Sequence, residues 1–202
     1  MEIKKKSEEI FNEANKILYD MNLLDTLERF GEVFITGSYF LNLMTWRDLD
    51  IYIKNDCIDK QTFCVLGGEI ACILNPHKMN YRDETILKRG LPDGLYWGVY
   101  TDIIHDNTWK IDIFAISPSI FQKTSNEAKQ LKEKISKEMR KIILEIKQNY
   151  CHSPLYRRGI YSVDIYKAVI DDKVRSIEEF GIWLKEKKDI GLQGISKKEE
   201  LF

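Results

Sequence analysis

The sequence has few of the residues that build metal and redox sites from thiols and imidazoles. Its 202 residues include four cysteines and three histidines. No two cysteines form a Cys-x-x-Cys pair, and the histidines show no zinc-site spacing. Cys57, Cys64 and Cys72 recur at steps that keep one helix face, which predicts a buried stripe of thiols. We therefore expect no metal or redox role for these cysteines.

The sequence also lacks a long apolar run and an excess of one charge. No stretch approaches the ~18 consecutive apolar residues of a membrane span, and the lysine-rich N-terminus continues into Ser-Glu-Glu, unlike a signal peptide. The formal net charge is -1, which indicates neither nucleic-acid binding nor an acidic tail. This globular composition predicts a cytoplasmic protein with no membrane partner.

The order of periodic segments predicts an α+β fold. Apolar or alternating runs at residues 33–36, 48–53, 95–104 and 109–115 indicate strands, and the last two are expected to form a hairpin. These strands predict a mixed sheet of four or five strands with flanking helices. Residues 81–88 fit neither periodicity.

Helical spacing marks several segments, and only helices are expected after the hairpin. The predicted helices cover residues 7–24, 39–44, 56–74, a long helix opened by a capping box at 124–127, and shorter helices near 163–170 and 176–184. We therefore expect a core domain of residues 1–116 and a C-terminal helical part of residues 117–202.

Two aspartates share one predicted strand face. Asp48 and Asp50 project to the same side because side chains alternate along a strand, whereas Leu49 points to the core. Neighbouring carboxylates repel each other unless a cation joins them. Mg²⁺ is the natural cation because it prefers hard oxygen ligands, and Mn²⁺ is an alternative.

The hairpin strand and the Gly-Ser turn add further polar groups. Asp112 can supply a third carboxylate, and Lys110 on the same face is either a solvated lysine or a charge for a phosphate or the aspartates. Gly37 lets the backbone approach a ligand closely. Ser38 lies where a short helix starts, a position that favours anions.

This arrangement resembles the nucleotidyltransferase superfamily, which includes DNA polymerase β and small antibiotic-modifying transferases. The resemblance covers residues 33–115 and lies in Gly37-Ser38, the Asp-x-Asp pair ten residues later, and Asp112 on a neighbouring strand. It implies transfer of a nucleoside monophosphate from a triphosphate to an acceptor hydroxyl by a two-metal mechanism, with release of pyrophosphate.

The resemblance also implies roles for individual residues. Asp48, Asp50 and Asp112 would be the catalytic metal ligands, and Gly37, Ser38 and Lys110 would bind the nucleotide. The acceptor is either a small molecule, such as an aminoglycoside or lincosamide, or a macromolecule, such as a tRNA end or a protein. The competing hypothesis is a non-catalytic nucleotide-binding or toxin–antitoxin-type partner protein with a retained site.

Three further interpretations concern residues around these motifs. Arg47 is expected on the strand face opposite to Asp48 and Asp50, so a structural salt bridge is its favoured role. Core packing is favoured over base stacking for the aromatic residues of segment 96–100. The polar and aromatic segment 157–166 is expected to cover the mouth of the site, with packing elsewhere as the alternative.

Overall fold

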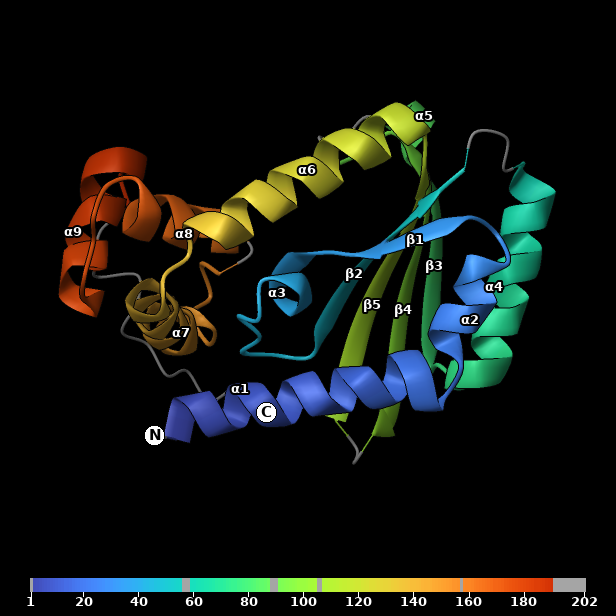
Figure 1. The fold of residues 1–202 in the computed structure, drawn as a ribbon, viewed down its shortest axis with the longest axis horizontal. Helices are drawn as coiled ribbons and strands as arrows, with labels where there is room; N and C mark the ends of the chain where they lie inside the picture. The colour runs from blue at the N-terminus through green and yellow to red at the C-terminus, as the bar shows by residue number, and fades with distance from the viewer. Residues whose placement is uncertain (1, 56–58, 88–90, 105–106, 157, 191–202) are drawn as a thin grey trace. The chain divides into compact units, whose positions relative to one another are not determined.

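The chain forms two compact units in the computed structural model, which describes residues 2–55, 59–87, 91–104, 107–156 and 158–190 (Figure 1). Ser7–Lys132 make up the first, here called the sheet unit, and Met1–Lys6 with Glu133–Phe202 make up the second, the helical unit. The functional boundary expected after residue 116 stays a prediction. No helix among the described residues is long and apolar enough to cross a membrane.

All five named strands belong to one mixed sheet in the sheet unit, with the order β1-β2-β5-β4-β3. They are β1 (Glu32–Ile35), β2 (Asp48–Lys54), β3 (Lys78–Asp83), β4 (Gly94–Ile104) and β5 (Asn107–Ile116). β2 and β5 run parallel, and the other neighbouring pairs run antiparallel. The predicted α+β fold with a mixed sheet is confirmed.

Helices precede, connect and follow these strands. In chain order, those up to the last strand are α1 (Glu2–Asn15), the π-helical turn η1 (Lys16–Asp20), α2 (Leu23–Glu28), α3 (Gly37–Phe40), α4 (Lys60–Leu74) and α5 (Glu84–Leu87). The later ones are α6 (Pro118–Lys134), α7 (Lys137–Tyr150), α8 (Ser162–Ile170) and α9 (Ile177–Lys188).

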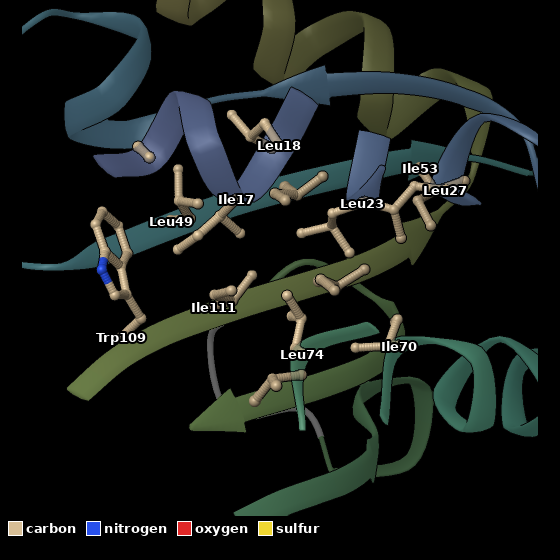
Figure 2. Close-up of a cluster of buried hydrophobic side chains, with 14 of the residues drawn as sticks. Ile17, Leu18, Leu23, Leu27, Leu49, Ile53, Ile70, Leu74, Trp109 and Ile111 are labelled. Atoms are coloured by element: carbon tan, nitrogen blue, oxygen red, sulfur yellow. The ribbon is translucent and has the colours of Figure 1, made fainter. Parts of the chain in front are cut away.

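One face of the sheet, here called the apolar face, carries the main hydrophobic core. Leu49 and Ile53 of β2 and Trp109 and Ile111 of β5 meet side chains of η1, α2 and α4 there, as Figure 2 shows. All four of these strand residues have no exposed surface. Alternation along β2 and β5 therefore sends one set of residues into the main core and the intervening residues to the opposite face. The first set is Leu49, Ile51, Ile53, Trp109, Ile111 and Ile113.

The opposite face carries a smaller apolar cluster only at one end. Tyr96, Phe114 and Ile116 pack there against Phe121 of α6. The rest of this face between β2, β5 and β4 bears charged and hydroxyl side chains, and it is called the polar face below.

Three predicted elements differ from the structure. β3 was not predicted and only its end overlaps the ambiguous residues 81–88; it is a strand because it pairs along its length with β4, a tertiary contact that its own periodicity does not reveal. Thr124 does not cap a helix: α6 begins at Pro118, a favoured first helical residue, and Thr124 Oγ1 donates to the Ile120 carbonyl 2.9 Å away. The expected long helix is two helices, since Ser136 caps a new one by accepting from the Met139 amide.

The predicted thiol stripe is wrong for the described cysteines. Cys64 and Cys72 are exposed on α4, and Cys57 lies outside the described residues. The buried side of α4 is formed instead by Phe63, Leu66 and Ile70. Cysteine is a small side chain, and the larger apolar residues of the helix decide which side faces the sheet.

The helical unit has its own aromatic core. Tyr150 of α7 meets Phe180 of α9 edge to face at 5.2 Å, and Phe180 stacks on Trp183 at 5.7 Å between ring centres. Ser176 caps α9 by accepting from the Glu179 amide, as the Ser-Ile-Glu-Glu sequence predicts.

Candidate functional site

The parallel pairing of β2 and β5 places the three predicted aspartates on the polar face. Asp50 lies directly opposite Asp112, and Asp48 lies directly opposite Lys110. The intervening Leu49 and Ile111 are fully buried on the other face. Two strands that are distant in the sequence thus place all three carboxylates and one ammonium on the same face, because their registers are in phase.

Lys110 bridges two of the three carboxylates. Its Nζ donates to Asp112 Oδ2 and lies 3.7 Å from Asp48 Oδ1. Burial alone would lower the pKa of Lys110, but the carboxylates of Asp48 and Asp112 outweigh it and raise the pKa above its ordinary value. Lys110 is therefore ion-paired with these carboxylates and not simply solvated, and it offsets the repulsion between the two aspartates.

Asp50 is placed by the Gly37 turn. Gly37 has a φ of +60°, and a Cβ there would lie 2.0 Å from Asp50 Oδ2. The Thr36 amide also donates to the Asp50 carbonyl at 2.8 Å, which ties the turn to β2. Only glycine combines this backbone conformation with this close approach. Gly37, the first residue of α3, therefore lies beside the Asp50 carboxylate, and Ser38 follows it in the helix.

Tyr96, for which packing was favoured over base stacking, packs with Phe114 as expected and also contacts one of the aspartates, which was not expected. Its hydroxyl donates to Asp112 Oδ1 at 2.6 Å. Gly98 lies directly opposite Asp112 on β4, and a Cβ there would lie 2.3 Å from the Tyr96 hydroxyl oxygen. The Tyr-x-Gly spacing opposite an aspartate is a sequence signal that becomes visible only once the hairpin register is known.

Tyr52 extends the polar face along β2. Burial first, and then the negative charges of Asp50 and Asp112, raise the pKa of Tyr52 to about 12. A phenol in this position stays protonated at neutral pH. The surroundings of the aspartates therefore favour cations and disfavour added negative charge.

The donor set fits a divalent cation, although it is not a preformed three-ligand centre. Among the described residues, no three histidine, cysteine, aspartate or glutamate side chains converge closely enough to hold a metal. Asp48 and Asp112 nevertheless share one cationic group, the Lys110 ammonium, and Asp50 borders Asp112 in register. Hard carboxylate oxygens around a shared positive charge are the ligands that Mg²⁺ and Mn²⁺ prefer.

Other predicted roles have mixed outcomes. Arg47 makes the expected structural salt bridge, with its Nε and one terminal nitrogen 2.6 and 2.8 Å from the Glu13 carboxylate. Trp97 packs in the core, where it stacks on Phe63 and donates to the Phe63 carbonyl at 2.9 Å. Tyr100 lies under the Lys78 ammonium, 4.9 Å from its ring centre.

The segment expected to cover the site belongs to the helical unit. Arg157 lies outside the described residues. Within the unit, Asp164 accepts from Lys188 at 2.6 Å, and the Tyr156 and Ser162 hydroxyls are 2.7 Å apart. These contacts stabilise the segment locally, and its expected position over the site stays a prediction.

Solved structures share the fold. Protein-family models and curated proteins give no match. A cytoplasmic RNA terminal U-transferase matches with a TM-score of 0.52 and 15% identity over 84% of this chain and 51% of its own. The Cid1 poly(U) polymerase, solved with MgGTP bound, matches with a TM-score of 0.54 and 15% identity over 84% of this chain and 55% of its own.

These neighbours define the class of the fold. Both are nucleotidyltransferases, so the fold expected from the Gly-Ser and Asp-x-Asp motifs is confirmed. The chain spans about half the length of these neighbours.

Proposed function

We propose that the protein is a Mg²⁺-dependent nucleotidyltransferase that moves a nucleoside monophosphate from a triphosphate to an acceptor hydroxyl. The observation that carries this proposal is the in-phase parallel register of β2 and β5, which puts Asp48, Asp50 and Asp112 on one face beside the Gly37 turn. The fold shared with solved nucleotidyltransferases supports it. Mn²⁺ is an alternative ion.

In this proposal the acceptor oxygen attacks the α-phosphorus of the triphosphate. A new oxygen–phosphorus bond forms, the bond to the bridging oxygen of the β-phosphate breaks, and pyrophosphate leaves. Asp48 and Asp50 would hold both metal ions, and Asp112 would join them at the ion nearer the acceptor and accept the proton of the acceptor hydroxyl. The two ions would stabilise the attacking and leaving oxygens. The residues themselves mainly orient the reactants and hold charge.

Gly37 and Ser38 bind the triphosphate in this proposal. The turn lies beside the Asp50 carboxylate, so groups bound to it are close to the metal ligands. Lys110 pairs with Asp48 and Asp112, and we assign it to a phosphate once these carboxylates bind metal. We assign the chemistry to residues 1–116 and a covering role to the helical part, residues 117–202.

Two observations bear on the acceptor: the reaction named for the neighbouring structures and the net charge of this chain. The neighbours transfer uridylate to RNA ends, which makes an RNA 3′ hydroxyl one candidate. A formal net charge of -1 gives little attraction to long nucleic acids, which supports a small-molecule or protein hydroxyl instead. Each candidate can be tested with the same labelled triphosphate.

The experiment is a transfer assay with each of the four α-³²P-labelled triphosphates. The protein is incubated with Mg²⁺ and, separately, with RNA, an aminoglycoside and lincosamide mixture, or a protein extract. We expect labelled product and pyrophosphate in one acceptor arm, and neither with Asp50→Asn. Arg47→Gln is the matched control. It removes a charge directly before β2, from a side chain that pairs with Glu13 and not with the three aspartates. Absence of transfer in every arm would contradict the proposal.

A second candidate is a non-catalytic nucleotide-binding partner protein. The Lys110 bridge favours it. The bridge offsets the repulsion between Asp48 and Asp112, so the folded protein can hold both aspartates without a catalytic metal ion. This protein would bind a triphosphate without releasing pyrophosphate. Calorimetric nucleotide binding together with no pyrophosphate release in any acceptor arm separates it from the enzyme.

A further inference from the structure

A chain of contacts leads from a fully buried carboxylate to Asp112. Glu84, which has no exposed surface, lies 2.7 Å from Nε of Arg82. The Arg82 guanidinium carbon lies 3.8 Å from the centre of the Tyr96 ring. The Tyr96 hydroxyl donates to Asp112 Oδ1 at 2.6 Å. Buried charges need partners, and Arg82 and Glu84 meet as an ion pair, although among the described residues Arg82 Nε and both Glu84 oxygens have no aligned hydrogen-bond partner.

The backbone holds these groups in register. Arg82 and Tyr96 are direct partners across β3 and β4, and Gly98 and Asp112 are direct partners across β4 and β5. The absent side chain of Gly98 is the space into which the Tyr96 hydroxyl extends. Phe114 lies 4.7 Å from the Tyr96 ring centre, so the ring is held by Phe114 as well as by the guanidinium.

Tyr96 is the donor in this contact. A phenol with its ordinary pKa of about 10 is protonated at neutral pH, and the Asp112 carboxylate can only accept from it. Asp112 Oδ1 is occupied by Tyr96, whereas Asp112 Oδ2 is the oxygen that shares the Lys110 ammonium with Asp48.

We propose that Tyr96, braced by Arg82 and Glu84, is a positioning residue that holds Asp112 Oδ1 and thereby turns Oδ2 toward the cation it shares with Asp48. The inference rests on the proposed function, since it assumes that the shared cation is a divalent metal ion during catalysis. Without the Tyr96 hydroxyl, the Asp112 carboxylate rotates about its Cβ–Cγ bond. An oxygen then points toward the shared cation for only part of the time. Groups that orient metal ligands in this way affect metal affinity by about 10–100-fold.

The test is Mn²⁺ binding, measured by electron paramagnetic resonance of the free ion with the full chain and no nucleotide. Tyr96→Phe removes only the hydroxyl, and Tyr81→Phe is the matched control because Tyr81 packs on Trp97, on the opposite face. Glu84→Gln removes the charge that braces Arg82 and provides a second variant if Tyr96→Phe fails to fold. Circular dichroism checks that each variant is folded.

We expect Tyr96→Phe to weaken Mn²⁺ binding by at least about tenfold, Glu84→Gln to weaken it less, and Tyr81→Phe to leave it unchanged. If Asp112→Asn weakens binding but folded Tyr96→Phe and Glu84→Gln bind like wild type, the positioning role is overturned and the metal site survives. If wild type does not bind Mn²⁺, or Asp112→Asn has no effect, the metal site of the proposed function fails and the positioning role fails with it.

Discussion

The two faces of the sheet are built from the same strands but serve different purposes. On the apolar face Leu49, Ile51 and Ile111 have no exposed surface and bind the sheet to its helices. On the polar face the side chains of Asp48 and Asp112 keep 17% and 14% of their surface exposed. Because neighbouring residues serve different faces, we expect stability and chemistry to respond separately to substitutions one residue apart.

The largest expected effect is on activity at the polar face. Asp50→Asn keeps the shape of the side chain but removes the negative charge assigned to the metal ions. We expect transfer to fall roughly 10²–10³-fold or more. The free energy of unfolding should stay within about 0.5 kcal/mol of wild type or rise, because the carboxylates no longer repel. Initial rates and urea titrations check both values, and residual activity within tenfold of wild type would refute the assigned role.

The apolar counterpart is Ile111→Ala, one residue before Asp112. Ile111 is fully buried in the main core, so the substitution leaves a cavity. We expect the free energy of unfolding to fall by about 2–5 kcal/mol. Activity per folded molecule should change little. A loss below 1 kcal/mol in urea titrations, or a specific loss of activity in a fully folded sample, would contradict the separation of the faces.

Gly37→Ala is expected to lower both stability and activity. The left-handed backbone costs an alanine about 1–2 kcal/mol, and its Cβ would displace the Asp50 carboxylate. We expect a moderate loss of stability together with a large loss of activity. Gly68→Ala is the control, since nothing lies near its Cβ on α4 and alanine is expected to stabilise that helix by about 0.5–1 kcal/mol. Thermal melts that rank the two variants in the opposite order would be incompatible with this geometry.

The smallest expected effect belongs to Lys110→Met. Its ammonium offsets the repulsion of Asp48 and Asp112, and its side chain is 25% exposed, which weakens the interaction by solvent screening. We expect a loss of about 1 kcal/mol in buffer without divalent cations. Mg²⁺ should recover part of that loss in the variant and stabilise wild type less. Equal stabilisation of both proteins by Mg²⁺ would show that Lys110 does not compete with the ion.

Alternation along the chain was sufficient to predict much of the sheet. β2 alternates along its whole length and β5 alternates from Trp109 to Ile113, and Asp48, Asp50, Lys110 and Asp112 lie on one face as expected. The sequence does not show that these two strands pair in parallel, because that contact joins residues about sixty positions apart. β3 was missed for a related reason, since only its pairing with β4 makes it a strand.

The candidate site was predictable where short spacing determines it. Gly37, Ser38 and the Asp-x-Asp pair are a local pattern, and the left-handed Gly37 follows the expected need for close approach. Tyr96, Arg82 and Glu84 were not predictable, because their contact depends on the registers of β3, β4 and β5. The glycine at position 98 has meaning only when it is known to lie opposite Asp112.

The central claim is that the polar face binds a metal-bound triphosphate, and a crystal structure with Mg²⁺ and a non-hydrolysable triphosphate analogue tests it most directly. The account predicts metal density in contact with Asp48, Asp50 and Asp112, with the triphosphate beside Gly37 and Ser38 and Lys110 moved away from the aspartates. A nucleotide bound elsewhere on the sheet unit, or Lys110 still bridging Asp48 and Asp112 with no metal between them, would contradict it.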